Sequence, residues 1–301
     1  MYGIQSTWLK PEAAGSSRTL LAAFAHPDDE SFGPGGALAK YSAEGAAVHY
    51  ACATRGEVGQ ASPKLLEGFT SLGDLRWHEL ECALHCLDLT GLHYLGYRDS
   101  GMPGSPDNAH PQALFQANFT RLVGQLVALI RWLHPQVVLT FDPYGGYGHP
   151  DHIAIHRATQ AAFLAAGSPD QYPEQIEVGL EAYTPHKLYY TAFPKTILRM
   201  ALIGIRVMGK DPTKFGRNQD INLTEIAAHE QAITTRLDIG RYLERKEQAA
   251  NCHRSQSGPG GMFGWMPLPL RRMLMGRESF TRVHPPADRH TRENDLFSGV
   301  A

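Results

Sequence analysis

Apolar runs of strand length alternate with amphipathic helical segments through most of this 301-residue chain, and this alternation restricts the folds open to it. The first pair is an apolar run over 20–25 and, after a Gly-rich turn, a helical segment over 36–44. Further strands are predicted over 47–54, 92–96, 137–141, 188–193 and 233–239, and further helices over 74–87, 112–133, 151–165 and 240–251. Repeated βα units form parallel sheets through right-handed crossovers. We therefore expect an α/β fold with a Rossmann-like, doubly wound, mostly parallel sheet.

A single domain over 1–301 is expected, because 301 residues of which 43% are hydrophobic can bury one full α/β core. The core is predicted over about 20–256. Segment 257–301 is apolar and rich in Gly and Pro, and we expect it to pack as an irregular tail on the core or at an interface. The apolar run 196–208 is shorter than the ~20 residues that cross a bilayer. It predicts a rim helix or a partner surface, and no stable membrane insertion.

Charge and leader sequence exclude several classes of partner. The formal net charge of -2 gives no reason to expect nucleic acid or an anionic membrane as a partner. The first 18 residues lack the apolar core and the cleavage pattern of a signal peptide. A cytoplasmic enzyme is the expectation.

The four cysteines, Cys52, Cys82, Cys86 and Cys252, form no CxxC pair. Cys82 and Cys86 lie four residues apart on a predicted helix, where sharing one face is more typical of buried thiols than of metal ligands. We expect all four thiols to be reduced, as is usual in the cytoplasm.

Two clusters of His and Asp follow predicted strands, as AHPDDE at 25–30 and GHPDH at 148–152. The first offers ligands for a divalent metal and leaves one carboxylate for proton transfer, while the second supplies a further nitrogen ligand. A lone HPD triplet would more often be a turn whose Asp caps a helix. The two clusters together favour a metal site.

The predicted topology brings these clusters together. In open α/β sheets, ligands bind outside the carboxyl ends of the strands. The residues that fall at this end are His26, Arg55, Arg98, Asp99 and the segment 142–152.

With these motifs, the chain resembles the PIG-L or LmbE-like family of zinc-dependent N-deacetylases, which act on N-acetylglucosamine-type amides. Further matches are ATRGE at 53–57, GYRDSG at 96–101, the block 144–152 and the stretch 246–256, so the resemblance runs over about 20–256. The strings GGYGHPDH and YRDSGM most resemble the subgroup that deacetylates GlcNAc-inositol or cleaves mycothiol conjugates.

The resemblance implies one zinc ion per chain, bound by His26, Asp29 and His152, although iron(II) or cobalt(II) would accept the same ligands. It also implies that Asp28 is the general base and that His149 stabilises the oxyanion or acts as the acid. A helix cap or a supporting hydrogen bond is the alternative for Asp28.

Further roles are assigned around these residues. Asp151 is expected to fix the tautomer of His149 by hydrogen bonding. The resemblance implies that Tyr147 reaches the substrate carbonyl, and an ordinary loop aromatic is the alternative. Arg55, Arg98 and Asp99 are expected to read the substrate, with a surface ion pair as the alternative for Arg98 and Asp99. The family's later helix is matched at Lys246, His253 and Gln256, for which no role follows from chemistry.

The expected activity is removal of an acetyl group from a GlcNAc-type glycoconjugate, such as GlcNAc-inositol or GlcNAc-malate, by attack of a zinc-activated water on the amide. The partner is then a small amino-sugar molecule, and the oligomeric state is open, a homo-oligomer included. An amidase acting on mycothiol or bacillithiol S-conjugates would share every catalytic residue. A non-catalytic sugar- or nucleotide-binding module is disfavoured, because residues 33–36 do not form GxGxxG and the neighbouring acids would repel a pyrophosphate.

Overall fold

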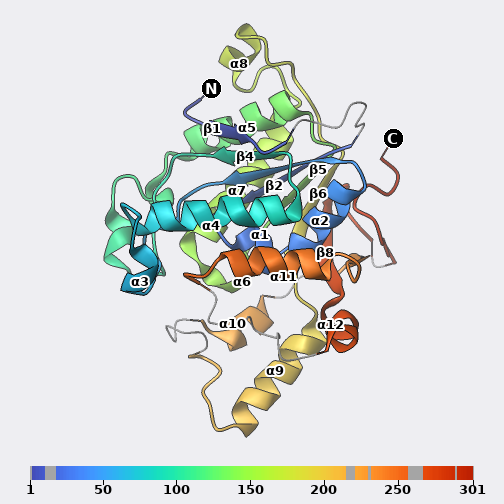
Figure 1. Ribbon diagram of the computed structural model, residues 1–301. Coiled ribbons are helices and arrows are strands. Elements are labelled where there is room, and N and C mark those ends of the chain that lie inside the picture. The colour runs from blue at the N-terminus through green and yellow to red at the C-terminus, as the bar shows by residue number, and fades with distance from the viewer. Residues whose placement is uncertain are drawn as a thin grey trace.

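An eight-stranded mixed sheet forms the centre of the molecule, in the order β1-β4-β3-β2-β5-β6-β8-β7 (Figure 1). The computed structural model describes residues 2–10, 18–214, 221–229, 232–256, 267–288 and 290–300. The strands are β1 (Gln5–Trp8), β2 (Thr19–Phe24), β3 (Ala47–Cys52), β4 (Gly91–Tyr94), β5 (Val137–Thr140), β6 (Lys187–Ala192), β7 (Thr235–Asp238) and β8 (Arg277–His284).

The five strands from β4 to β6 in this order are parallel, as expected from the repeated βα units. The sheet as a whole is mixed, because β1 pairs antiparallel with β4, and β8 pairs antiparallel with both β6 and β7. Antiparallel neighbours need no crossover helix. The two ends of the chain can therefore extend the sheet without adding further βα units.

Helices cover both faces of the parallel strands, which makes the central strands fully buried. On one face α2 (Gly35–Ala43), α4 (Leu72–Leu87) and α11 (Leu243–Cys252) pack on one another, while α5 (Phe119–Leu133) packs on α7 (Pro150–Ala165) on the other (Figure 1). All six residues of β3 are buried. Continuous apolar strands of this kind are the consequence of a parallel sheet covered on both sides.

The α5 helix begins seven residues later than the predicted start at residue 112. Its N-cap is Asn118, whose side chain accepts a hydrogen bond from the Arg121 amide at 3.0 Å. The preceding stretch instead forms two short 3-10 helices, Pro106–Ala109 and Leu114–Gln116. The side-chain cap satisfies an orphan amide of the first turn and so sets the start of the helix.

The segment expected to be an irregular tail contributes β8, which lies between β6 and β7 in the sheet. Glu278 on β8 accepts hydrogen bonds from the amides of Gly36 and Ala37 at 2.9 and 2.7 Å, at the start of α2. Lys246 donates to the same carboxylate at 2.6 Å. This strand therefore supports the Gly-rich turn that follows the first His/Asp cluster. Residues 257–266 lie outside the described residues.

Three further helices gather at one pole of the molecule, namely α9 (Lys195–Val207), α10 (Leu223–Ala228) and α12 (Leu268–Met275) (Figure 1). The predicted rim helix over 196–208 corresponds to α9. No described helix combines the length and the apolar character that crossing a membrane requires. The remaining short helices are α1 (Asp29–Phe32), α3 (Pro63–Leu66), α6 (Gly145–Gly148) and α8 (Pro173–Glu177).

Cys82 departs from the expectation of a buried, reduced thiol. It is exposed on α4 and forms a disulfide with Cys252 at the end of α11. The reason is tertiary, since α11 packs along α4 and brings together two cysteines 170 residues apart. Cys52 and Cys86 are free.

Candidate metal centre

The first His/Asp cluster forms a tight turn at the carboxyl end of β2. Asp28 adopts φ = 121°, a backbone conformation that non-glycine residues rarely occupy. The turn places Asp29 at the start of α1, where its Oδ2 accepts hydrogen bonds from the amides of Ala25 and His26 at 3.1 and 2.8 Å. The strained turn therefore brings a histidine and two carboxylates into one small volume.

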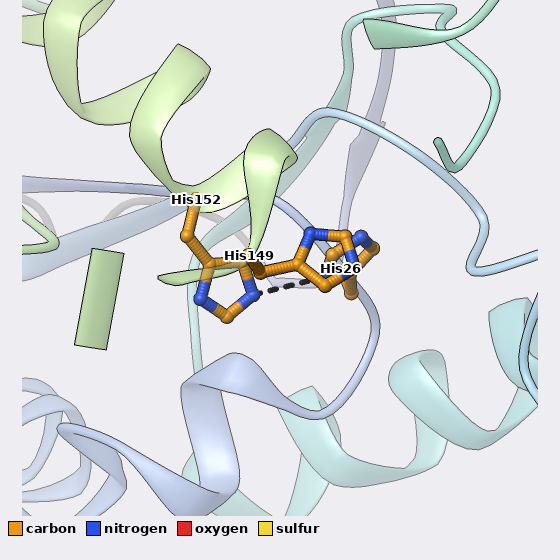
Figure 2. Close-up of side chains that lie close together, drawn as sticks. All are labelled: His26, His149 and His152. Atoms are coloured by element: carbon orange, nitrogen blue, oxygen red, sulfur yellow. Dashed lines mark hydrogen bonds between the residues drawn. The ribbon is translucent and has the colours of Figure 1, made fainter. Parts of the chain in front are cut away.

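The side chains of the three predicted ligands lie close together, and His149 lies within the same group of possible metal-binding residues as His26 and His152. His26 Nδ1 lies 3.1 Å from His152 Nε2 (Figure 2). The Asp29 carboxylate faces both rings with different oxygens, Oδ2 at 3.8 Å from His26 Nδ1 and Oδ1 at 3.4 Å from His152 Nε2. A tetrahedral zinc site with bonds of about 2.0–2.1 Å separates its donor atoms by about 3.3 Å. The donor set and its spacing thus fit a zinc-class ion.

Hydrogen bonds orient both imidazole rings for coordination. His152 Nδ1 lies 3.0 Å from the Gly145 carbonyl oxygen, which assigns the proton to Nδ1 and leaves Nε2 free to ligate. His26 Nε2 lies 3.1 Å from Asp151 Oδ2 and 3.5 Å from Asp99 Oδ1, which leaves Nδ1 facing His152. The two facing nitrogens, His26 Nδ1 and His152 Nε2, form a hydrogen bond with each other, and a cation bound between them would take the place of the shared proton.

The electrostatics of the site favour positive charge. Although burial opposes it, the Asp99 and Asp151 carboxylates raise the pKa of His26 well above its ordinary value. Burial, with His149 and His26 nearby, lowers the pKa of His152 well below its ordinary value, so this ring is a neutral ligand. Burial also raises the pKa of Asp29 to about 7, so its anionic form needs a cationic partner.

The Asp151 carboxylate does not hold His149, contrary to expectation. It accepts hydrogen bonds from His26 Nε2 and from the Ser100 amide, at 3.1 and 2.9 Å, and also from the Ser100 hydroxyl. His149 is instead the N-cap of α7, where its Nδ1 accepts a hydrogen bond from the Asp151 amide at 3.2 Å. At the first turn of α7, the Asp151 side chain therefore supports the ring of His26, a predicted metal ligand, rather than the neighbouring histidine.

His149 lies beside the ligands, with its ring centroid 4.6 Å from that of His26 (Figure 2). Because Nδ1 accepts the helix-capping hydrogen bond, the proton of the neutral ring is assigned to Nε2. Burial, followed by the charge of His26, lowers the pKa of His149 to about 4. His149 is therefore a neutral hydrogen-bond donor at pH 7.

Asp28 is held by Arg76, which the sequence analysis did not identify. Arg76 Nη2 donates to Asp28 Oδ2 at 3.0 Å and to the Pro27 carbonyl at 2.7 Å, and Nη1 donates to the Gly56 carbonyl at 2.9 Å. Burial raises the pKa of Asp28, and the Arg76 charge opposes this increase. The sequence signal for Arg76 was a cation among the buried positions of α4, including Leu75 and Leu80.

A second buried pair, His253 and Glu30, supports the turn that contains Asp28. His253 Nε2 lies 2.6 Å from Glu30 Oε1, and neither residue is exposed to solvent. Glu30 Oε2 also accepts the Asp28 amide at 3.0 Å. Although burial opposes it, the charge of His253 lowers the pKa of Glu30. His253, which matched a motif without a derived role, is therefore a supporting residue.

The three residues predicted to contact the substrate have different surroundings in the structure. Asp99 is buried in the site next to His26, whose charge holds the pKa of Asp99 well below its usual range despite burial. Arg55 pairs with Asp74 at 3.2 Å, and Arg98 pairs with Asp107 at 2.7 Å. The structure thus brings Asp99 to the metal ligands and turns the two arginines toward other carboxylates.

Tyr147 lies on the Gly-rich segment that connects β5 to α7. Its ring centroid is 4.8 Å from that of His152 and 6.0 Å from that of His149. Burial raises the pKa of the Tyr147 phenol well above its ordinary value, so the hydroxyl keeps its proton. The ring therefore lies beside the two His residues of the second cluster.

Comparisons with known proteins identify the family of this chain. A family model described as PIG-L, GlcNAc-PI de-N-acetylase, matches residues 21–163. The chain is 35% identical over 295 residues to the 1D-myo-inositol 2-acetamido-2-deoxy-alpha-D-glucopyranoside deacetylase of Thermobifida fusca, covering 94% of this chain and 100% of that protein. It is 36% identical over 299 residues to the protein of the same name from Rhodococcus jostii, covering 95% and 99%.

Solved structures share the fold at lower sequence identity. The N,N'-diacetylchitobiose deacetylase of Pyrococcus horikoshii has a TM-score of 0.61 and 21% identity, with 88% of this chain and 84% of that chain covered. The 4-carboxy-2-hydroxymuconate hydratase of Pseudomonas putida has a TM-score of 0.57 and 20% identity, with 91% and 99% covered. Because a deacetylase and a hydratase share this architecture, the fold alone does not select the reaction.

Proposed function

The chain belongs to the PIG-L family of GlcNAc-PI de-N-acetylases, and from this premise we propose that it removes the acetyl group from a GlcNAc-type glycoconjugate. GlcNAc-inositol is the substrate favoured by the relatives, which are named as deacetylases of that compound and match almost the whole chain. The observation that carries the proposal is the close approach of His26 Nδ1 and His152 Nε2, at 3.1 Å, with one Asp29 oxygen 3.8 Å from the first ring and the other oxygen 3.4 Å from the second.

We propose that His26, Asp29 and His152 hold one Zn²⁺ ion per chain, a donor set that iron(II) and cobalt(II) would also accept. When bound, such an ion lowers the pKa of water and polarises an amide carbonyl. Asp99 and Asp151 hold His26 in the tautomer that ligates, and the Gly145 carbonyl does the same for His152.

Asp28 takes the proton of the attacking water in this proposal. Its carboxylate is held by Arg76 at 3.0 Å, and 19% of its side chain is exposed. An ion pair with a buried guanidinium favours the ionised form that a general base requires. The neighbouring Asp29 is excluded from this role because its oxygens accept two backbone amides and face the ligand histidines.

His149 and Tyr147 stabilise the charge that develops on the amide oxygen. Both residues are neutral hydrogen-bond donors at neutral pH. Burial lowers the pKa of His149, so its ring is neutral and carries one proton, on Nε2. Burial raises the pKa of Tyr147, so its hydroxyl stays protonated. A neutral imidazole donates a hydrogen bond but carries no second proton to release. The proton that the leaving amine needs therefore comes from Asp28, which received it from water.

Arg55 and Arg98 remain the proposed contacts to the sugar or the aglycone. Their side chains are about one-third exposed, and each is paired with an exposed or half-exposed carboxylate that a polar substrate can replace. The Asp99 carboxylate is paired with His26, so in this proposal Asp99 positions that ligand rather than contacting the substrate. We propose that the reaction takes place in the cytoplasm, with a small amino-sugar molecule as partner.

The decisive experiment is a substrate panel for the purified, metal-loaded protein. GlcNAc, GlcNAc-malate, GlcNAc-inositol and a mycothiol-type S-conjugate are compared by detection of the free amine. We expect GlcNAc-inositol to be hydrolysed most efficiently. Preferential hydrolysis of the S-conjugate would support the amidase instead, and metal-replete protein without any hydrolysis at any pH would support a non-catalytic module.

A further inference from the structure

Three cysteine sulfur atoms gather between α4 and α11, outside the metal centre. Cys82 and Cys86 lie one helical turn apart on α4, and Cys252 is the last residue of α11. Cys82 and Cys252 form a disulfide, while Cys86 Sγ lies 3.8 Å from Cys252 Sγ. All three sulfur atoms lie within 4.8 Å of one another. Cys252 thus has two sulfur neighbours on the same face of one helix.

The three residues differ in their access to solvent. Cys82 is exposed, whereas Cys86 and Cys252 are half-buried. A disulfide with only a structural role has no need for a third thiol at van der Waals distance from one of its sulfur atoms. A thiol at this distance reaches the disulfide once rotation of the Cys86 side chain brings its sulfur into line with the Cys82–Cys252 bond, because exchange proceeds by attack of a thiolate on a disulfide sulfur.

We propose that Cys82, Cys86 and Cys252 form a thiol–disulfide exchange site that accepts low-molecular-weight thiols at Cys82. In the internal step, Cys86 gives its proton to solvent and its thiolate attacks Cys252 Sγ. The Cys86–Cys252 bond forms as the Cys82–Cys252 bond breaks, and the electron pair of the broken bond leaves on Cys82, which takes a proton from solvent. This step involves no net oxidation or reduction.

In the external step, the released Cys82 thiol gives its proton back to solvent, and the resulting thiolate attacks a small disulfide RSSR. A mixed disulfide forms between Cys82 and one RS group, and the other RS group leaves as a thiolate. Cys82 is the exposed member of the cluster and is accessible to such a reagent. Burial raises the pKa of Cys86, so the internal step is expected to be faster at alkaline pH, where more thiolate is present.

The position of Cys252 connects this chemistry to the supports of the metal-site turn. The next residue, His253, contacts Glu30 at 2.6 Å. Two residues later, the Ser255 amide and hydroxyl donate to the Glu79 carboxylate at 2.8 and 2.6 Å. When Cys252 changes its disulfide partner, the change therefore occurs next to the segment that contacts the buried acids Glu30 and Glu79. The exchange itself does not depend on the proposed deacetylase activity.

The test is a mapping of thiols in the oxidised, folded protein. The wild-type protein is incubated with N-ethylmaleimide without reductant, and its peptides are analysed by mass spectrometry. We expect label on Cys82 together with a Cys86–Cys252 disulfide. Cys52 is fully buried and serves as the internal control for unfolding, since it should stay unlabelled. Label on Cys86 alone, with Cys82–Cys252 as the sole disulfide at both pH 7 and pH 9, would overturn the proposal.

Two variants separate exchange from simple reactivity. With oxidised glutathione alone, which carries no thiol, the wild-type protein should gain a glutathione adduct on Cys82. The Cys86→Ser variant should not gain this adduct, because nothing then releases Cys82. The Cys82→Ser variant should form Cys86–Cys252 under mild oxidation, with circular dichroism confirming its fold. An adduct on Cys82 in Cys86→Ser, or a Cys82→Ser variant that stays reduced, would refute the exchange step.

Discussion

At the scale of single residues, each side chain that we propose as a metal ligand has its other polar atom occupied by a hydrogen bond. His26 and His152 each direct one ring nitrogen to a carboxylate or a carbonyl, and Asp29 Oδ2 accepts two amides. These second contacts remove the rotational freedom of the rings and the carboxylate before any cation arrives. Mutations can therefore distinguish the proposed base, Asp28, from the proposed ligand next to it, Asp29.

The first prediction concerns the third ligand. The His152→Ala variant should lose most of its metal and most of its turnover, because three protein ligands leave no redundancy. Elemental analysis after gel filtration measures the metal content. The His149→Ala variant is the matched control, because His149 lies beside the same ligands but is assigned to the oxyanion, and it should keep its metal. Full metal occupancy in His152→Ala would show that the ligand set is wrong.

The second prediction separates the base from the ligand next to it. The Asp28→Asn variant should keep its metal while turnover falls on the order of a hundredfold or more, the usual scale for a general base. The amide can still accept a hydrogen bond from Arg76, so the turn should survive the change. Metal content and turnover are measured on the same preparation. Loss of metal from this variant would mean that the roles of Asp28 and Asp29 are exchanged.

At the scale of elements, the metal-site turn depends on a buried guanidinium reaching across from α4. Gly56 leaves the space for it, because a Cβ at this position would lie 2.1 Å from Arg76 Nη1. Gly56 also has φ = 68°, a conformation suited to glycine. Gly56, in the loop after β3, therefore helps to orient Asp28, the proposed base, by leaving space for Arg76.

The third prediction follows from this contact. The Gly56→Ala variant should lose about 3 kcal/mol or more of unfolding free energy, because displacing Arg76 breaks a buried ion pair, which costs about 3–5 kcal/mol. Turnover should fall as well. Gly45→Ala is the matched control, since Gly45 also has a positive φ of 85° but a Cβ added there would meet nothing within 4 Å. It should cost only about 1–2 kcal/mol and leave turnover unchanged. Equal effects in urea unfolding would contradict the role given to Arg76.

At the scale of the whole molecule, the sheet buries two histidines that lie apart from the metal centre. His49 on β3 and His93 on β4 face each other, with 3.1 Å between His49 Nδ1 and His93 Nε2. Burial lowers the pKa of His49 to about 4, and burial with the charge of His49 lowers the pKa of His93 to about 3. Both rings are neutral in the folded protein and titrate near 6.5 when unfolded.

The fourth prediction is a loss of stability in mild acid. Below pH 6.5 the unfolded chain binds protons that the folded chain does not, so the free energy of unfolding falls as pH falls toward about 4. At pH 5 each ring should cost about 2 kcal/mol relative to pH 7.5. Urea unfolding at both pH values should show a smaller loss for His49→Asn than for wild type. His78→Asn, at an exposed position of α4, should leave the loss unchanged, and identical losses in all three proteins would refute the assignment.

The sequence alone determined the parallel core and predicted the three donor residues that the structure brings close together. The reason is local, because apolar strand runs and the HPDD and HPDH turns that follow them are encoded by neighbouring residues, and parallel topology brings the turns to one edge. Tertiary structure decided what supports them. Asp151 holds His26 rather than His149, Arg76 holds Asp28, and β8 joins the sheet from a segment whose composition predicts an irregular tail. Such partners depend on how helices and strands distant in the chain pack, and no local pattern encodes that packing.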